Sequence, residues 1–203
     1  MWVVKLGGSL AHSPDLNSWL DVFSDPSGIK VVIVPGGGSY ADEVRRSQKI
    51  SGFDDDTAHR MAILAMDKFG LWLCEKTKHF IPAKSAAEIE EALNQHRMPI
   101  WIPSAMTLTD TSIPASWDVT SDSLAAWLAT LLSADALILV KSAQVNFSSI
   151  DRNTLSGLGI VDKAFPQFAN CDRYQARVLH ASQHELMREA LRSGEPAGVQ
   201  VVN

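Results

Sequence analysis

The sequence of 203 residues lacks the features that mark several specialised classes of protein. It has only two cysteines, Cys74 and Cys171, which share no metal-type spacing, so neither a disulfide framework nor a zinc module is indicated. No apolar run reaches the ~18 residues that a membrane span requires. Because a strand-like segment follows Met1 directly and leaves no room for a signal peptide, we expect a cytoplasmic protein.

Runs of basic residues are also missing. The formal net charge is −5, with 23 acidic against 18 basic residues, and the lysines and arginines are not clustered. Proteins that bind nucleic acids or membrane surfaces derive their affinity from basic patches. The composition therefore argues against both partners and favours a small-molecule substrate. The length is that of one domain with a single sizeable core, spanning residues 1–203.

Two groups of glycines follow apolar, strand-like segments. Val3–Leu6 leads into Gly7, Gly8 and Ser9, and residues 30–35 lead into 36–38, which are three consecutive glycines. Turns without Cβ atoms leave their backbone N–H groups uncovered, an arrangement that suits phosphate. In a parallel sheet both turns would lie at the edge formed by the carboxyl ends of the strands, where open α/β sheets bind ligands. We therefore expect two anionic groups to face each other at this edge.

The hydrophobic periodicity alternates between the patterns of strands and helices along the chain. Helices are expected over 15–23, 39–50, 57–73, 84–96, 124–132, 162–168 and 183–192, and strands over 3–6, 30–34, 99–103, 136–142, 177–180 and 198–202. The segments 106–117 and 146–159 are expected to be loops. This alternation predicts an α/β fold, a three-layer sandwich with an open, mainly parallel sheet. The helix over 57–73 is apolar around much of its circumference, which predicts a homodimer or a higher homo-oligomer.

Polar side chains crowd the segment Trp117–Ser123, where the helix over 124–132 begins. One residue is enough to cap a helix, so this segment holds more hydroxyls and carboxylates than capping needs. Lys141 stands at the end of the strand over 136–142 and would reach the same edge of the sheet.

Three other groups of residues have alternative interpretations. The aspartates at 54–56 could bind a metal, but we favour a loop that caps the next helix. His180 and His184 have the spacing of zinc ligands, although no third ligand is evident. His59 is interpreted as a packed or capping histidine in preference to a substrate contact.

The glycine motifs can also be compared with two known nucleotide-binding motifs, the Walker A loop and the dinucleotide-binding fingerprint. Neither turn has the spacing of a Walker A loop. The pattern Gly36-x-Gly38-x-x-Ala41 satisfies a loose dinucleotide fingerprint, but the acidic residue expected ~20 positions further on does not end a second strand. A nicotinamide-dependent oxidoreductase therefore stays as an alternative function.

Four motifs in order resemble the amino acid kinase superfamily. They are Lys-x-Gly-Gly-Ser at 5–9, Pro-Gly-Gly-Gly at 35–38, Thr-x-Asp-x-x-Ala at 120–125 and Ala-Asp-x-Leu-Ile-Leu at 134–139. Segments 58–67, 117–124 and 157–166 further resemble a subgroup of small kinases that act on an aminomethylfuran phosphate in methanofuran biosynthesis. The segment Val140–Asn146 departs from the Thr-Asp-Val-Asp-Gly-Val-Tyr that many members carry after the nucleotide-side strand.

The resemblance implies transfer of the γ-phosphoryl group of ATP, bound with Mg²⁺, to an acceptor phosphate. The implied catalytic residues are Lys5, which would bridge the γ-phosphoryl group, and Asp122, which would orient Lys5. The implied ATP- and phosphate-binding residues are Gly7, Gly8, Ser9, Lys141, Asp162 and Lys163, and the implied substrate-binding residues are Gly36, Gly37, Gly38, Trp117, Thr120 and Ser121. The acceptor-side lobe would span about 1–125 and the nucleotide-side lobe about 126–203.

The subgroup resemblance also implies what the acceptor pocket contains. An aminomethylfuran phosphate needs apolar walls, for which Trp117 and Phe165 are candidates, and a carboxylate for its amine, for which Asp67, Asp118 and Asp162 are candidates. Uridylate, isopentenyl phosphate or a carboxylate are alternative acceptors within the superfamily, and a non-catalytic nucleotide sensor is a further alternative.

Overall fold

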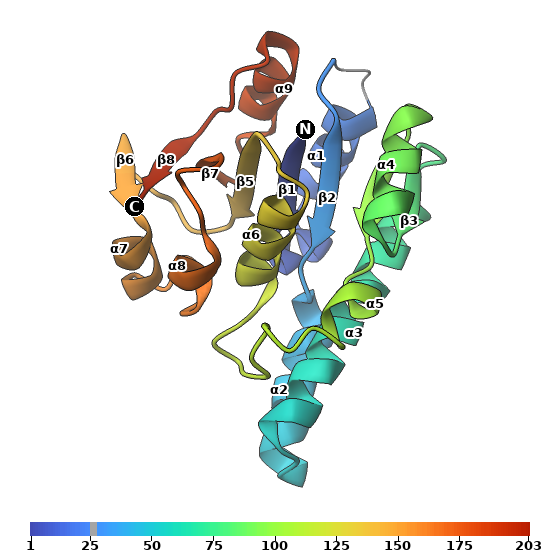
Figure 1. Cartoon of the computed structure of the whole chain (residues 1–203), viewed down its shortest axis with the longest axis vertical. Coiled ribbons are helices and arrows are strands. Elements are labelled where there is room, and N and C mark those ends of the chain that lie inside the picture. Colours follow the sequence, from blue (N-terminus) through green and yellow to red (C-terminus); the bar gives the residue numbers. More distant parts are fainter. Residues whose placement is uncertain (25–27) are drawn as a thin grey trace.

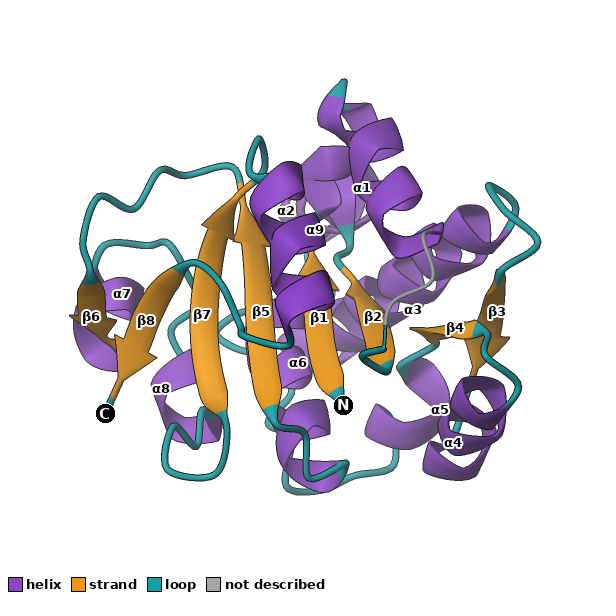
Figure 2. Ribbon diagram, turned by 90° about the horizontal axis from the view of Figure 1, so that it is seen from above, coloured by secondary structure: helices purple, strands orange, loops and turns teal. Residues whose placement is uncertain are grey.

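The computed structural model describes residues 1–24 and 28–203 and shows three layers, with one sheet between two layers of helices (Figure 1, Figure 2). The strands are β1 (Trp2–Leu6), β2 (Val31–Pro35), β3 (Phe80–Ala83), β4 (Met98–Trp101), β5 (Ala136–Lys141), β6 (Ser149–Asp151), β7 (Gln175–His180) and β8 (Val199–Val202). The helices are η1 (Gly8–His12), α1 (Asp15–Ser24), α2 (Gly38–Ser51), α3 (Asp55–Cys74), α4 (Ala86–Asn94), α5 (Ser104–Thr107), α6 (Ser121–Leu131), α7 (Arg152–Gly157), α8 (Phe165–Phe168) and α9 (His184–Ser193). The predicted α/β sandwich is confirmed.

The sheet has the order β3-β4-β2-β1-β5-β7-β8-β6. Among the strands of the described residues, β7 and β8 are the one antiparallel pair, and the other neighbouring pairs are parallel. Near its centre, Lys5 of β1 is in register with Val34 of β2 and Leu139 of β5. The carboxyl ends of these three strands therefore lie together at one edge of the sheet, as the glycine motifs predict.

Alternation along β1 decides which side chains face each helical layer. Trp2, Val4 and Leu6 belong to the core cluster that includes residues of α1, α3 and α9. Val3 belongs to the opposite cluster, which includes most of the buried face of α6. Because successive side chains of a strand point to opposite faces, Lys5 shares the face of Val3 and points toward the α6 layer.

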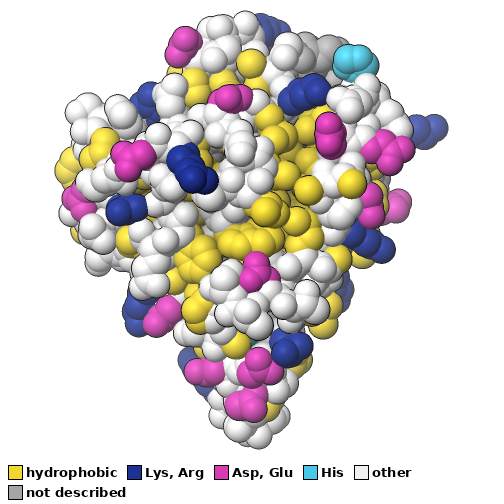
Figure 3. Space-filling model, viewed as in Figure 1, with side chains coloured by type: hydrophobic (Ala, Val, Ile, Leu, Met, Phe, Trp, Pro, Cys, Tyr) yellow, Lys and Arg dark blue, Asp and Glu magenta, His cyan; other side chains and the backbone are white. Residues whose placement is uncertain are grey.

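The helices α2 and α3 pack against each other and extend beyond the carboxyl edge of the sheet (Figure 1). Charged side chains gather at the tip of this pair, whereas hydrophobic side chains spread over the middle of the face seen in Figure 3. The turn between them is closed by Gln48, whose Nε2 donates to Oδ1 of Asp55 at 2.8 Å. Asp54 caps α3 by accepting a hydrogen bond from the Thr57 N–H, which confirms the capping role, but the loop is shorter than expected because Asp55 and Asp56 belong to the first turn of α3.

The sequence-based expectation is wrong for two segments. Residues 80–83 form strand β3, where no element is predicted, and the expected loop over 146–159 contains β6 and α7. Both strands lie at the edges of the sheet. β3 has four residues, including Pro82, and β6 has three, so neither gives a clear hydrophobic period.

No helix in the described parts of the chain is long and apolar enough to cross a membrane.

Candidate active site

The two glycine turns touch each other through their backbones. A Cβ atom on Gly8 would lie 2.1 Å from the Gly38 nitrogen, and one on Gly36 would lie 2.4 Å from the Gly8 nitrogen. Gly38 also has a φ of +54°, in the left-handed region that favours glycine. Any side chain at these positions would push the turns apart, so the glycines are required to bring the ends of β1 and β2 together.

A buried ion-pair cluster lies where β1, β5 and α6 meet. Lys5 is 4% exposed and Asp122, in the first turn of α6, is 3% exposed. Lys5 Nζ forms an ion pair with Asp122 Oδ1 at 2.8 Å, which does not have hydrogen-bond geometry. Lys141 Nζ donates a hydrogen bond to the other carboxylate oxygen, Asp122 Oδ2, at 2.7 Å. One carboxylate faces two ammonium groups, so the cluster has a net positive charge. The structure thus places Asp122 beside Lys5, the pair that the family resemblance implies, and adds Lys141, which the sequence offers separately as a second cation.

The cluster perturbs the protonation of its members. Burial alone would raise the pKa of Asp122, but the charges of Lys5 and Lys141 outweigh it and lower that pKa to about 2. Burial lowers the pKa of Lys141, and the neighbouring charge of Lys5 lowers it further. At neutral pH Asp122 is therefore ionised and holds both lysines.

Asp162 fixes the beginning of α6. Its Oδ2 accepts from the N–H and hydroxyl of Thr120 and from the Ser123 N–H at 2.8 to 3.0 Å. Its Oδ1 accepts from the Ser123 hydroxyl and, at 2.9 Å, from the Phe165 N–H. Burial and the charge of Asp122 raise the pKa of Asp162. Asp162 therefore caps α6 from about forty residues away and positions Asp122, while its predicted contact with the nucleotide stays a prediction.

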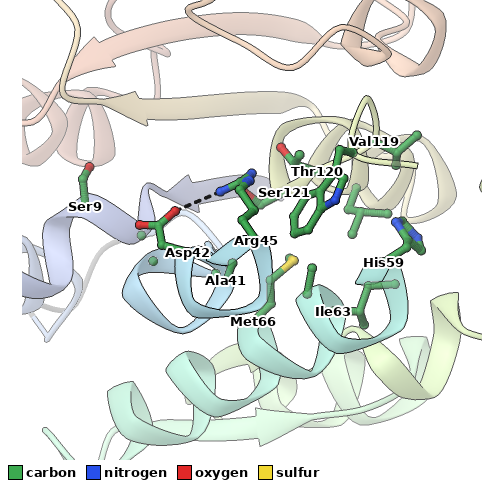
Figure 4. A pocket seen from close by; sticks show the side chains of 16 residues that line it. Ser9, Ala41, Asp42, Arg45, His59, Ile63, Met66, Val119, Thr120 and Ser121 are labelled. Carbon is green, nitrogen blue, oxygen red and sulfur yellow. Dashed lines mark hydrogen bonds and ion pairs between the residues drawn. The ribbon is translucent and has the colours of Figure 1, made fainter. Parts of the chain in front are cut away.

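A cavity of about 210 Å³ lies beside the glycine turns. Side chains from α2, α3 and the start of α6 line it, with Arg45 reaching from α2 toward the start of α6 and Asp42 beside it (Figure 4). Its lining residues are Gly8, Ser9, Gly37, Gly38, Ala41, Asp42, Arg45, His59, Ala62, Ile63, Met66, Trp117, Val119, Thr120, Ser121 and Leu124. Five of the six predicted substrate-binding residues are in this lining; the sixth, Gly36, lies behind it against Gly8.

Other predicted residues stand apart from the cavity. Phe165 is fully buried in the core, so it is not available as a pocket wall. Lys163 is 81% exposed, and its Nζ lies 3.2 Å from Asp118 Oδ1. Asp67 accepts a hydrogen bond from the Ser104 N–H and caps α5, and burial raises its pKa.

Sequence reasoning missed Asp42 and Arg45 and gave His59 a packing role. Asp42 and Arg45 are three residues apart on α2, the spacing of an ordinary surface ion pair, and nothing local distinguishes them from one. His59 is buried yet lines the cavity, and burial lowers its pKa, so it is neutral at pH 7. The signal that could have found Asp42 and Arg45 is their position about one and two helical turns after a phosphate-facing glycine turn.

The donor groups of this site do not form a metal centre. Among the described residues, no group of three or more His, Cys, Asp or Glu side chains could hold a metal ion, and His180 and His184 are no exception. Both oxygens of Asp122 face lysines, and both oxygens of Asp162 accept hydrogen bonds. A magnesium ion held mainly by protein ligands therefore does not fit this site.

Comparison with known proteins places this geometry in a family. The sequence profile of the amino acid kinase family matches residues 1–144. The chain is 26% identical to the [5-(aminomethyl)furan-3-yl]methyl phosphate kinase of Methanocaldococcus jannaschii, over 94% of this chain and 93% of that protein. The structure is similar to uridylate kinase from Archaeoglobus fulgidus, with a TM-score of 0.72, 18% identity and 99% coverage of both chains. It is also similar to UMP kinase from Ureaplasma parvum, with a TM-score of 0.69, 17% identity and coverage of 100% and 95%.

Proposed function

Because the chain belongs to the amino acid kinase family and is therefore a phosphotransferase, we propose that it transfers the γ-phosphoryl group of ATP to the phosphate of an aminomethylfuran phosphate. The products are ADP and a diphosphate, within the biosynthesis of a methanofuran-type cofactor. Membership in this family replaces the nicotinamide-dependent oxidoreductase as an interpretation of the glycine motifs.

The observation that carries the proposal is the net positive Lys5–Asp122–Lys141 cluster beneath two touching glycine turns. In phosphoryl transfer the main task is to hold two anions in line while negative charge spreads over the transferring group. A buried excess positive charge at this point supplies the required electrostatic stabilisation. The paired turns supply uncovered N–H groups for both anions.

The residues divide into two sides. Gly7, Gly8 and Ser9 bind the transferring end of ATP, and Lys5 bridges the γ-phosphoryl group while it stays paired with Asp122. Lys141 stabilises the departing diphosphate of ADP. Gly36–Gly38 bind the acceptor phosphate, and Trp117, Thr120 and Ser121 contact the rest of the acceptor.

One bond forms and one breaks in this reaction. An oxygen of the acceptor phosphate attacks the γ-phosphorus, and the bond from that phosphorus to the β–γ bridging oxygen breaks as ADP leaves. A phosphate monoester has its second pKa near ~6, so the acceptor is largely ionised at neutral pH and needs no general base. The neutral His59 is therefore free to act as a hydrogen-bonding wall of the pocket.

The size of the cavity supports a small acceptor. About 210 Å³ is below the ~300–1,000 Å³ that drug-sized ligands occupy. A single ring with two short arms suits this volume better than a nucleotide does. We assign the nucleotide to the side formed by residues 126–203, where Lys141 ends β5 beside the ion-pair cluster. Magnesium belongs to the substrate, as its complex with ATP, because the protein donors do not form a metal centre.

The test is phosphoryl transfer from ATP·Mg²⁺ to a panel of acceptors, monitored by ADP release and by the phosphorus NMR spectrum of the product. Aminomethylfuran phosphate is expected to give a diphosphate with the highest kcat/KM. Preferred use of uridylate, isopentenyl phosphate or a carboxylate would reject this acceptor but keep the kinase activity. Failure of every acceptor, with ATP still bound, would favour a nucleotide sensor instead.

A further inference from the structure

The acceptor pocket contains a carboxylate that the sequence does not predict. Asp42 is the single acidic residue in the lining of the cavity among the residues that the structure describes. The acids predicted to receive the acceptor's amine are engaged elsewhere: Asp67 with Ser104, Asp118 with Lys163, and Asp162 with the start of α6. An ammonium group bound in this pocket can therefore pair with one carboxylate of the lining, that of Asp42.

Asp42 stands at a defined place relative to the proposed phosphate position. The helix α2 begins at Gly38, and four residues of α-helix advance about 6 Å along the axis. Asp42 is thus about one helical turn from the N-terminus of α2, where the acceptor phosphate is assigned. One turn is the span of a five-membered ring that carries a phosphate on one short arm and an amine on the other. Between them, the small side chain of Ala41 lines the cavity and leaves room for the ring.

Arg45 holds Asp42 without occupying both of its oxygens. Arg45 Nη1 donates to Asp42 Oδ1 at 2.9 Å, and its guanidinium carbon lies 4.4 Å from the centre of the Trp117 ring. Trp117 is itself fixed, because its Nε1 donates to Gln48 Oε1 at 2.7 Å. In the described part of the chain, Asp42 Oδ2 has no hydrogen-bond donor. The second oxygen is therefore available to a ligand while Arg45 stays in place.

We propose that Asp42 is a specificity-determining residue, whose Oδ2 accepts a hydrogen bond from the ammonium group of the acceptor. This inference rests on the proposed function and adds to it the substrate class: a phosphate monoester that carries a primary amine about one helical turn away. An acceptor with a neutral group at that position forgoes the charge interaction, and one with a second anion there is repelled.

The decisive experiment compares Asp42→Asn with the unaltered protein on two acceptors, aminomethylfuran phosphate and its hydroxymethyl analogue. Asparagine keeps the size of the side chain and an oxygen for Arg45 but removes the charge. KM for the amine-bearing acceptor is expected to rise about 10- to 100-fold, because a charge-assisted hydrogen bond at a 65%-exposed side chain is lost. The kcat value, KM for ATP and KM for the hydroxymethyl analogue are expected to stay within about threefold. Asp42→Glu is expected to restore part of the preference for the amine.

Glu43→Gln is the matched control. Glu43 is the next residue of α2, is paired with Arg46 and is absent from the lining of the cavity among the described residues. Its substitution changes the net charge by the same amount, and both acceptors should keep their KM values.

Three results would overturn the inference, and they can be told apart. If Asp42→Asn leaves the preference for the amine unchanged while the unaltered protein phosphorylates the amine-bearing acceptor, the role of Asp42 is wrong and the proposed function stands. If Asp42→Asn lowers kcat equally for both acceptors, Asp42 only positions the pocket wall. If the unaltered protein makes no diphosphate from either acceptor, the proposed function is wrong, and the inference about Asp42, which rests on it, is wrong as well.

Discussion

At the residue scale, the chemistry of the site depends on one carboxylate shared by two lysines. Lys5 and Lys141 come from neighbouring parallel strands and point to the same face of the sheet, where the first turn of α6 presents Asp122. Neither lysine could be buried there without Asp122, because an unpaired buried ammonium group is costly. Asp122 in turn is ionised only because the lysines flank it.

Lys5→Ala should lower turnover by at least ~100-fold with a smaller effect on the KM of the acceptor. The reason is that its charge is used mainly where negative charge is redistributed during transfer. Steady-state kinetics of the folded variant, with circular dichroism as the test of folding, measure this effect. Lys49→Ala, an exposed lysine of α2, is the control and should keep its turnover. Near-normal turnover of Lys5→Ala would refute its catalytic role.

Asp122→Asn should reduce both activity and stability, and the loss of stability should depend on pH. The folded-state pKa of about 2 lies below the ordinary value of 3.8, so the ionised carboxylate stabilises the fold above pH 4, and this contribution disappears as the pH falls toward 2. The shift corresponds to about 2 kcal/mol. Urea unfolding from pH 5 to pH 2 should show the difference in unfolding free energy between the two proteins shrinking over this range. A difference that stays constant with pH would show that the charge of Asp122 is not what stabilises the site.

At the scale of elements, the approach of two turns sets the geometry of the site. The N-terminus of α2 reaches the end of β1 only because Gly8, Gly36 and Gly38 place backbone against backbone. The capping of α6 by Asp162 fixes the opposite wall. These contacts join residues far apart in sequence, so each element is placed by partners that local patterns do not reveal.

Gly38→Ala and Gly52→Ala form a matched pair at the two ends of α2. Both glycines have positive φ, +54° and +69°, so alanine should cost each about 1 kcal/mol of backbone strain. A Cβ atom on Gly38 would lie 2.9 Å from the Gly8 carbonyl oxygen, whereas one on Gly52 would meet nothing within 4 Å. Denaturant unfolding should therefore show a loss in both variants, and kinetics should show at least tenfold lower kcat/KM in Gly38→Ala alone. Equal activity of the two variants would mean that contact between the turns is not required.

The sequence predicts the helices and strands whose hydrophobic periodicity is strong, and it predicts the motifs at the ends of strands. Lys5 and Lys141 are predictable because both stand near the carboxyl ends of parallel strands that meet at one edge of the sheet, whereas Asp122 is predicted from the resemblance of its motif to the kinase family. The short edge strands β3 and β6 are not predictable, since three or four residues give too little pattern. The capping by Asp162 and the pocket position of Asp42 depend on long-range packing, and a sequence pattern shows neither.

At the scale of the whole molecule, the packing around the sheet leaves one face of α3 uncovered. Ala58, Ile63, Phe69 and Leu73 pack into the protein, among the buried residues of α3. Met61, Leu64 and Leu71 are large apolar residues that stay exposed on the other side of the helix. Their spacing places all three on a single stripe. The predicted homodimer would bury this stripe.

Leu64→Asp should therefore convert the dimer to a monomer, because it places a charge in the middle of the apolar stripe of α3. Light scattering coupled to gel filtration at micromolar concentration measures the mass directly. Leu131→Asp on α6 is the matched control, since Leu131 and Leu64 are 50% and 51% exposed, and it should leave the dimer intact. Dissociation by Leu131→Asp alone would move the interface to the α6 face, which has its own hydrophobic area in Figure 3. A monomeric unaltered protein would refute the dimer altogether, whatever the variants do.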